Sequence, residues 1–158
     1  MVSFVSTELR IDALVDDSIC LLLTGTVGAN KEAVKLIGNY HKDMSVQAYF
    51  EYDAKKSSGW TISHMRFSPK VGIRAPFRVE EGQGDYVACH NEGYVQANKF
   101  DVVKFCKRRG NFFLNTSVAA ISDPEERLQA LEQIISPKIL RQLAMKNVNV
   151  SFVCRGVW

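Results

Sequence analysis

Short apolar segments alternate with amphipathic ones through the first half of the chain. Ile19–Leu23 is an apolar run that predicts a buried strand, and Val27–Asn39 carries apolar residues near one face of a helix. Ser45–Tyr52 alternates apolar and polar residues, and Trp60–Phe67 follows after a polar turn at Ala54–Gly59. We expect these two strands to pair as an antiparallel β-hairpin.

The second half of the chain continues the alternation. After an irregular stretch that contains glycine, a buried strand is predicted at Asp85–Cys89. A helix is predicted over Lys99–Arg108, ending at Arg109-Gly110, and a short strand at Phe112–Asn115.

Two further helices have marked beginnings. Asp123 is a good N-cap before Pro124, with Glu126 at the third helical position, and Ser136-Pro137 repeats the device. A last strand alternates through residues 147–152. This order predicts an α/β fold: a Rossmann-like, mostly parallel sheet flanked by helices, with an antiparallel β-hairpin.

Size and charge fit one globular domain, and the mildly basic balance is too weak to indicate a nucleic-acid-binding module. The 158 residues suffice for one domain, and acidic residues interrupt the basic ones to leave a formal net charge of +3. The densest basic cluster is Lys104, Lys107, Arg108 and Arg109. It falls at the end of a predicted helix, where cations favour the negative end of the helix dipole. We expect no nucleic-acid partner.

The four cysteines and three histidines form no metal-binding motif. Neither a C-x-x-C nor an H-E-x-x-H spacing occurs, and each cysteine lies beside apolar residues, which predicts buried, reduced thiols. Acidic residues within the first twenty positions argue against a signal peptide, and Ile19–Leu23 is too short to span a membrane. We expect an intracellular protein with no membrane partner.

The segment Gly25-Thr26-Val27-Gly28-Ala29-Asn30-Lys31 joins the first strand to the first helix. A turn of this kind presents backbone N–H groups and a positive helix end to a phosphate. Asn30 and Glu32 replace residues that a Walker A loop requires, and the glycines do not complete G-x-G-x-x-G. A tight turn without a ligand is the alternative interpretation.

Other polar residues lie at positions that suit a ligand or a partner. Lys55, Lys56 and Ser57 fall at the hairpin tip, where they suit a phosphate-bearing ligand or form a solvated loop. His64 and Arg66 share one strand face by period two, a frequent form of interdomain contact. His90 follows a predicted strand, where α/β sheets bind ligands, and a turn role is the alternative. No nucleophile–base arrangement emerges.

Several stretches together resemble the pyruvate:ferredoxin (flavodoxin) oxidoreductase family. They are GTVGANK at 25–31, QAYFEYDAKKSSG at 47–59, SHMRF at 63–67, IRAP at 73–76, VACHN at 87–91 and GNFFLN at 110–115. The resemblance covers residues 24–153, and the portion it matches is the γ-type domain. Residues 1–18 match nothing in the family, residues 119–136 are longer than its pattern, and we interpret 19–158 as an incomplete γ-type domain, from a fragment or a truncated form.

The resemblance implies a function for the whole enzyme. Family members oxidatively decarboxylate a 2-oxoacid, here pyruvate, with thiamine diphosphate and magnesium. They pass electrons through [4Fe–4S] clusters to ferredoxin or flavodoxin and transfer the acyl group to coenzyme A. The γ-type domain is linked with coenzyme A binding and with packing against the thiamine-binding and iron–sulfur domains or subunits, which hold the other cofactors. The implied compartment is the cytoplasm or an anaerobic organelle similar to a hydrogenosome or mitochondrion.

The resemblance and the polar loops lead to one hypothesis about the site. Backbone amides of the first turn and the Lys31 side chain face one phosphate group of coenzyme A, through Gly25, Thr26, Gly28, Asn30 and Lys31. Lys55, Lys56 and Ser57 face another, with Arg66 or Arg74 as further contributors. We expect no catalytic residue and no metal ligand in this chain. The alternatives are an interdomain scaffold, an inactive fragment, and an unrelated α/β protein that prefers ATP or NAD.

Overall fold

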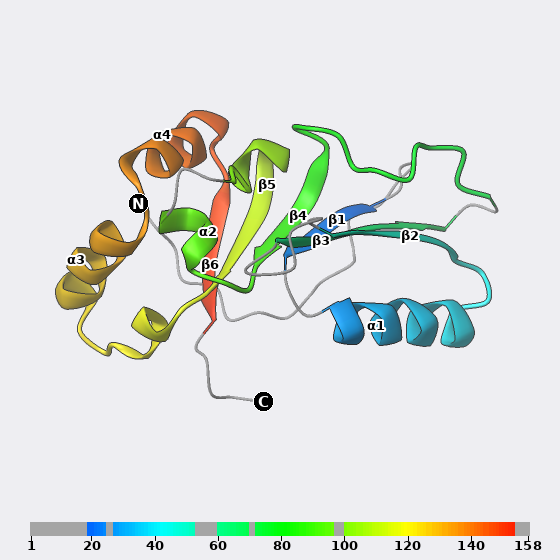
Figure 1. Ribbon diagram of the computed structural model, residues 1–158, viewed down its shortest axis with the longest axis horizontal. Helices are drawn as coiled ribbons and strands as arrows, with labels where there is room; N and C mark the ends of the chain where they lie inside the picture. The colour runs from blue at the N-terminus through cyan, green and yellow to red at the C-terminus, as the bar shows by residue number, and fades with distance from the viewer. Residues whose placement is uncertain (1–18, 25–26, 53–59, 70–71, 97–99, 154–158) are drawn as a thin grey trace.

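The computed structural model describes residues 19–24, 27–52, 60–69, 72–96 and 100–153 (Figure 1). Its elements, in chain order, are β1 Ile19–Thr24, α1 Val27–Tyr40, β2 Ser45–Tyr52, β3 Thr61–Ser68, β4 Gly84–Cys89, α2 Gly93–Gln96, the 3₁₀ helix η1 Val103–Phe105, β5 Cys106–Asn115, the 3₁₀ helix η2 Ser117–Ala120, α3 Pro124–Ile134, α4 Pro137–Lys146 and β6 Asn149–Val153.

The strands form one six-stranded sheet in the order β2-β3-β1-β4-β5-β6. Strand β3 runs antiparallel to both of its neighbours, β2 and β1, whereas β1, β4, β5 and β6 pair in parallel. The predicted fold is therefore confirmed, because the sheet is mostly parallel and β2–β3 is the expected antiparallel hairpin.

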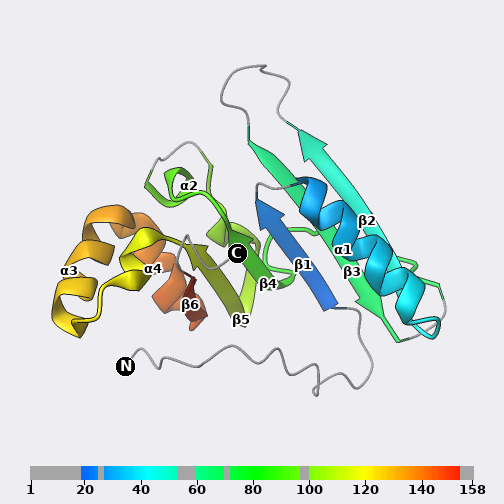
Figure 2. The same ribbon diagram turned by 90° about the horizontal axis from the view of Figure 1, so that it is seen from below.

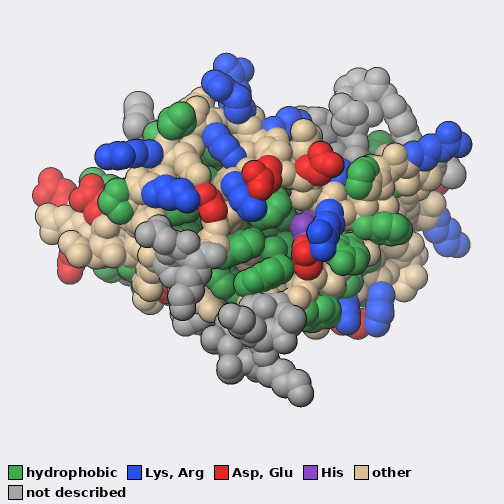
Figure 3. Space-filling model, turned by 45° about the horizontal axis from the view of Figure 1, so that its top comes forward, with side chains coloured by type: hydrophobic (Ala, Val, Ile, Leu, Met, Phe, Trp, Pro, Cys, Tyr) green, Lys and Arg blue, Asp and Glu red, His purple; other side chains and the backbone are tan. Residues whose placement is uncertain are grey.

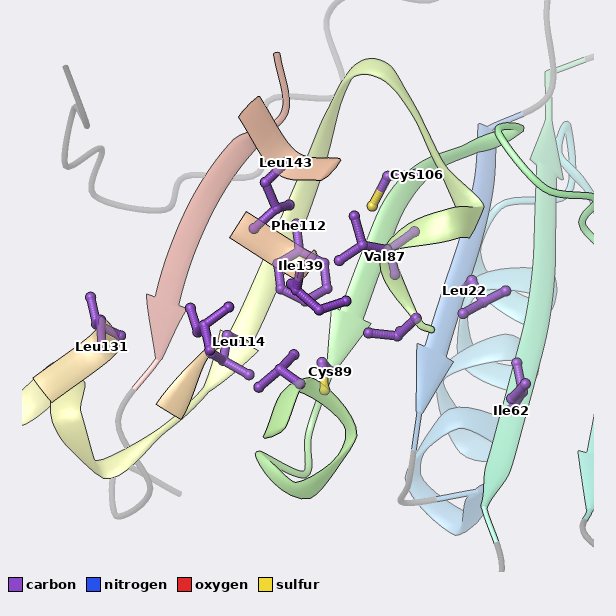
Figure 4. Close-up of a cluster of buried hydrophobic side chains, with 14 of the residues drawn as sticks. Leu22, Ile62, Val87, Cys89, Cys106, Phe112, Leu114, Leu131, Ile139 and Leu143 are labelled. Atoms are coloured by element: carbon purple, nitrogen blue, oxygen red, sulfur yellow. The ribbon is translucent and has the colours of Figure 1, made fainter. Parts of the chain in front are cut away.

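Helices cover the two faces of the sheet in different places. Helix α1 packs against β2 and β3, as the view from below shows (Figure 2). Helices α2 and α4 lie on the opposite face, where Val95, Ile139 and Leu143 join one apolar core (Figures 1 and 4). The chain thus leaves β1 toward one face and leaves the adjacent β4 toward the other. Such a point in an α/β sheet is where ligands bind, outside the carboxyl ends of the strands.

The core lies between the sheet and α4. Phe112 and Leu114 of β5 and Val87 of β4 are shielded from solvent, and Figure 4 shows Ile139 and Leu143 directed from α4 toward Phe112. The free cysteines Cys89 and Cys106 are buried in the same cluster, as the sequence predicted for its thiols. Cys20 and Cys154 lie among residues whose side chains the structure does not describe.

Both marked helix beginnings are confirmed. Asp123 accepts a hydrogen bond from the Glu126 backbone N–H at 2.8 Å, and Ser136 accepts one from the Ile139 N–H at 3.4 Å. Each cap is followed by proline in the first turn, where the missing N–H costs nothing. Within the described residues, no helix combines the length and the apolarity needed to cross a membrane.

The helix predicted over Lys99–Arg108 is wrong. Its described residues form η1 and the beginning of β5, which runs as far as Asn115. Arg109-Gly110 lies inside this strand at an irregularity in the pairing with β4: Arg109 has φ 59°, and a Cβ on Gly110 would lie 3.0 Å from the Lys107 carbonyl oxygen. The irregularity interrupts the two-residue period, which hides the strand from pattern analysis.

The basic cluster therefore lies at the beginning of a strand rather than at a helix end. Lys107 pairs with Asp85 at 3.2 Å, and Lys104 pairs with Glu81 at 2.8 Å. Figure 3 shows basic and acidic side chains mixed over one face of the molecule, with hydrophobic side chains gathered between them. This mixture is typical of a solvated protein surface rather than of a nucleic-acid footprint.

Candidate functional site

The strand register brings the described ends of β1, β2 and β4 to one edge of the sheet. Thr24 at the end of β1 pairs with Ile62, and Ile62 pairs with Glu51 near the end of β2. Thr24 also pairs with Cys89 at the end of β4. The chain thus leaves β1, β2 and β4 at the same edge, with β1 and β2 separated by about 10 Å because strands are about 4.8 Å apart.

Helix α1 begins at this edge. By helix geometry the backbone N–H groups of its first turn have no intrahelical partner, and they point along the helix axis toward its N-terminal end. A Cβ on Gly28 would meet nothing within 4 Å, and its φ is not in the left-handed region. Neither packing nor backbone conformation therefore requires glycine here, whereas the close approach of a ligand to the backbone would.

The Lys31 side chain reaches from α1 toward the hairpin. Lys31 is exposed, and its ammonium nitrogen lies 5.3 Å from the centre of the Phe50 ring on β2. A cation held over an aromatic face keeps its charge and remains accessible to an anion. Lys31 therefore places a positive charge between the first turn of α1 and the end of β2.

The Asn30 side chain has a different role from its backbone. It is buried and donates a hydrogen bond from Nδ2 to Ser63 Oγ on β3 at 2.9 Å. This contact fixes the first turn of α1 against the sheet. Ser63 is not recognisable as a site residue from the sequence, because no local pattern pairs two residues 33 positions apart.

We expect Asn30→Ala to lower the free energy of unfolding by about 1–3 kcal/mol, since Ser63 Oγ would lose its buried partner. Urea denaturation measures the change. Asn39→Ala is the matched control, because Asn39 is exposed on the same helix. Equal stabilities of the two variants would show that the Asn30–Ser63 contact does not hold the turn.

Five of the predicted site residues lie outside the described residues: Gly25, Thr26, Lys55, Lys56 and Ser57. The structure describes where the chain enters and leaves these two segments, at Thr24 and Val27 and at Tyr52 and Trp60. Both segments therefore start from the edge that carries the first turn of α1.

His90 lies at the same edge, immediately after β4. Its backbone N–H donates to Thr24 Oγ1 at 3.3 Å, and Thr24 Oγ1 donates to the Ala88 carbonyl at 3.3 Å, so Thr24 links the ends of β1 and β4. Burial lowers the pKa of the half-buried His90 imidazole, which favours the neutral form. The neutral form of His90 therefore lies beside the point where the chain segments that follow β1 and β4 diverge.

The remaining candidates belong to the other face. Arg66 is buried and donates to the Pro76 and Arg78 carbonyls, and His64 is buried against Glu51. Arg74 is exposed on the segment that covers these residues. The face shared by His64 and Arg66, as period two predicts, is therefore occupied by residues of this chain.

The two described thiols, Cys89 and Cys106, lie in the apolar core. Burial raises the pKa of Cys89 to about 11 and that of Cys106 to about 12, so the thiolate forms that bind metals are disfavoured. The described residues contain no group of three His, Cys, Asp or Glu side chains placed to hold a metal ion.

Comparison with known protein families gives one match over most of the chain. The family described as "Pyruvate ferredoxin/flavodoxin oxidoreductase" matches residues 24–153. This span begins at the last residue of β1 and ends at the last residue of β6.

Individual relatives carry related names. The chain is 43% identical over 124 residues to a pyruvate dehydrogenase (NADP+) of Cryptosporidium parvum. This alignment covers 78% of this chain and 6% of the relative. It is 42% identical over 118 residues to a pyruvate:ferredoxin oxidoreductase of Moorella thermoacetica. That alignment covers 74% of this chain and 10% of the relative. The chain thus spans about a tenth or less of these relatives' length. A pyruvate oxidoreductase subunit of Thermotoga maritima superimposes with a TM-score of 0.44 at 19% identity, covering 71% of this chain and 55% of that one.

Proposed function

Because the chain belongs to the pyruvate ferredoxin/flavodoxin oxidoreductase family, we propose that it forms one domain of a pyruvate-oxidising enzyme and docks coenzyme A there. The whole enzyme decarboxylates a 2-oxoacid and transfers electrons to ferredoxin or flavodoxin. In this proposal thiamine diphosphate, magnesium and the [4Fe–4S] clusters belong to its other domains or subunits.

One observation supports the coenzyme A proposal: the strand register brings Thr24 and Tyr52, after which the two candidate loops begin, to the edge of the sheet at which α1 begins. Coenzyme A carries a diphosphate and a separate 3′-phosphate. The α1 turn, with Gly25, Thr26, Gly28, Asn30 and Lys31, provides backbone N–H groups and a cation for one of them. Lys55, Lys56 and Ser57 at the hairpin tip provide cations and a hydroxyl for the other.

Calorimetric titration with coenzyme A, 3′-dephospho-coenzyme A and ATP tests the proposal. We expect coenzyme A to bind, and removal of the 3′-phosphate to weaken binding. Lys55→Ala/Lys56→Ala should weaken it by about tenfold or more, since a charge-assisted hydrogen bond contributes about 1.5–3 kcal/mol. An unchanged dissociation constant in this variant would remove the hairpin from the site, and a preference for ATP would favour an unrelated nucleotide-binding role.

The Gly28→Ala variant distinguishes an effect on coenzyme A affinity from an effect on stability. The added methyl group meets nothing within 4 Å, and alanine favours a helix over glycine, so stability should stay equal or rise by up to about 1 kcal/mol. Coenzyme A affinity should nevertheless fall, because the methyl group stands where the phosphate approaches the backbone. Gly38→Ala, in the last turn of the same helix, is the control and should leave affinity unchanged.

A second candidate function is an interdomain scaffold without a ligand. Large apolar side chains are exposed on several elements, with Tyr40 80%, Met145 77% and Phe77 62% accessible. Exposed apolar side chains of this size suit packing against the remainder of a longer enzyme. A folded chain that gives no heat with any of the three ligands would favour this function over coenzyme A docking.

A further inference from the structure

The segment 72–79 is an irregular loop that is fixed to the sheet by buried polar side chains. It runs between β3 and β4 on the face opposite α1 (Figure 1). Its backbone is held by hydrogen bonds from Gln47 to the Ala75 carbonyl, from Arg66 to the Pro76 and Arg78 carbonyls, and from the Val79 N–H to His64. Irregular backbone held in this way by side chains of β2 and β3 depends on those side chains keeping their hydrogen-bonding roles.

His64 makes the contact whose role depends on a proton. Its side chain is 2% exposed, and Nδ1 lies 3.0 Å from the Val79 backbone nitrogen. The Val79 N–H is a donor, so Nδ1 is the acceptor and carries no proton. Nε2 then carries the proton and donates to Glu51 Oε2 at 3.1 Å. The loop contact therefore requires the neutral imidazole in one tautomer.

Charged and aromatic side chains from several elements surround His64. Glu51 on β2 accepts from Nε2 and also from the Arg78 guanidinium, which lies 2.6 Å from its other oxygen. Arg66 on β3 and Arg78 on the loop are positive, whereas the neighbouring Tyr49 and Phe105 rings are neutral. Arg78 and a protonated His64 would thus compete for one carboxylate.

We propose that His64 is a proton-operated latch that holds the 72–79 loop on the sheet when neutral and releases it when protonated. A proton from solvent binds Nδ1, and the Val79 N–H then faces another N–H, so that hydrogen bond breaks. The loop carries Arg78 away from Glu51, which leaves the carboxylate to pair with the imidazolium. The latch involves the face opposite α1 and does not depend on coenzyme A binding.

The direction of the pH dependence follows from the two states. Burial lowers the pKa of His64 in the closed state below 6.5; the Glu51 contact opposes this effect, and the charges of Arg78 and Arg66 add to it. In the open state the imidazolium pairs with the Glu51 carboxylate, which keeps the pKa of His64 there from falling below its ordinary value of about 6.5. At pH values well above the open-state pKa both states are neutral, and the opening equilibrium does not change with pH. As pH falls below that value, the open state binds a proton that the closed state does not. Opening then increases about tenfold per pH unit, until the closed-state pKa is reached.

Amide hydrogen exchange of the chain, followed residue by residue from about pH 8 to about pH 5 and corrected for intrinsic exchange rates, tests the latch. Protection of the Val79 amide should fall as the pH decreases from neutral toward about pH 5, by at most about tenfold per unit because one proton is bound. The Thr116 amide is the internal reference, because it donates to the Val153 carbonyl at 2.8 Å and belongs to another part of the chain than the loop. Its protection should not change. Equal loss at both amides would mean global unfolding and would overturn a local latch.

Two further measurements complete the test. In the wild-type chain, ¹⁵N chemical shifts should show the Nε2-protonated tautomer of His64 at neutral pH, and the opposite tautomer would overturn the proposal. His64→Gln removes the titrating group, so Val79 protection should become independent of pH, whereas His41→Gln changes an exposed histidine and should retain the wild-type response. Persistence of the pH response in a folded His64→Gln variant would also overturn the latch.

Discussion

Replacing Phe112 by alanine is expected to lower the free energy of unfolding by about 3–5 kcal/mol, because the ring is fully buried in the apolar core. The loss combines the transfer of apolar surface with a cavity between β5 and α4. Neighbours on both sides limit collapse into that cavity, since Val87 on β4 and Ile139 on α4 are themselves held in the core. For a domain of this size the melting temperature should fall by about 6–20 °C.

Thermal and urea denaturation of Phe112→Ala and of Phe77→Ala measure this effect. Phe77 is 62% exposed, so its truncation should change stability by about 0.5 kcal/mol or less. The pair compares the same chemical change inside and outside the core. A loss of stability for Phe112→Ala as small as that for Phe77→Ala would show that the Phe112 ring is not enclosed in the core between β5 and α4.

Replacing Lys146 by methionine is expected to destabilise the chain by about 2–4 kcal/mol. The ammonium group donates to the carbonyl oxygens of Val103, Lys104 and Cys106 at 2.8–2.9 Å. These carbonyls belong to the 3₁₀ turn and the beginning of β5, and those of Val103 and Lys104 also accept backbone N–H groups, from Cys106 and Gly82. Methionine keeps most of the apolar stem but leaves three acceptors without their charged donor, and each such bond contributes about 1.5–3 kcal/mol before relaxation and hydration.

Lys138→Met is the matched control for this variant. Lys138 lies on the same helix, is mostly exposed and pairs with Asp101 at 3.4 Å, so its loss should cost about 1 kcal/mol or less. Urea denaturation of both variants gives the comparison. If both lose the same stability, the Lys146 ammonium does not fasten the 3₁₀ turn to α4.

The sequence predicts elements well where local chemistry determines them. Alternation in Ser45–Tyr52 indicates β2, and the Asp123-Pro124 and Ser136-Pro137 pairs identify the beginnings of α3 and α4. The helix predicted over Lys99–Arg108 failed because the irregularity at Arg109-Gly110 shifts the strand's alternation. In the sequence, a basic residue followed by glycine resembles the end of a helix. In the structure, Arg109 instead adopts a φ of 59°, which is uncommon for arginine.

The candidate site is predictable only in part. The first turn of α1 is recognisable from its glycines and its position after a strand, and the family resemblance adds the hairpin tip. Contacts between distant segments are not recognisable in the same way: Asn30 meets Ser63, and His64 meets both Glu51 and Val79. Those pairs depend on the strand register, which no local pattern encodes.

The place of β1 inside the sheet affects how the chain acquires its fold. Its two neighbours are β3 and β4, so Thr24 finds Ile62 on one side and Cys89 on the other. The β2–β3 hairpin closes a short loop, whereas every parallel pairing closes a long one and gains its contacts late. During synthesis β1 can pair with the hairpin early, whereas its other edge stays unpaired until β4 has been made. The parallel half of the sheet is complete only after Val153 has emerged. Until then an unpaired apolar strand edge is open to misassociation, which makes this topology one that profits from chaperone protection.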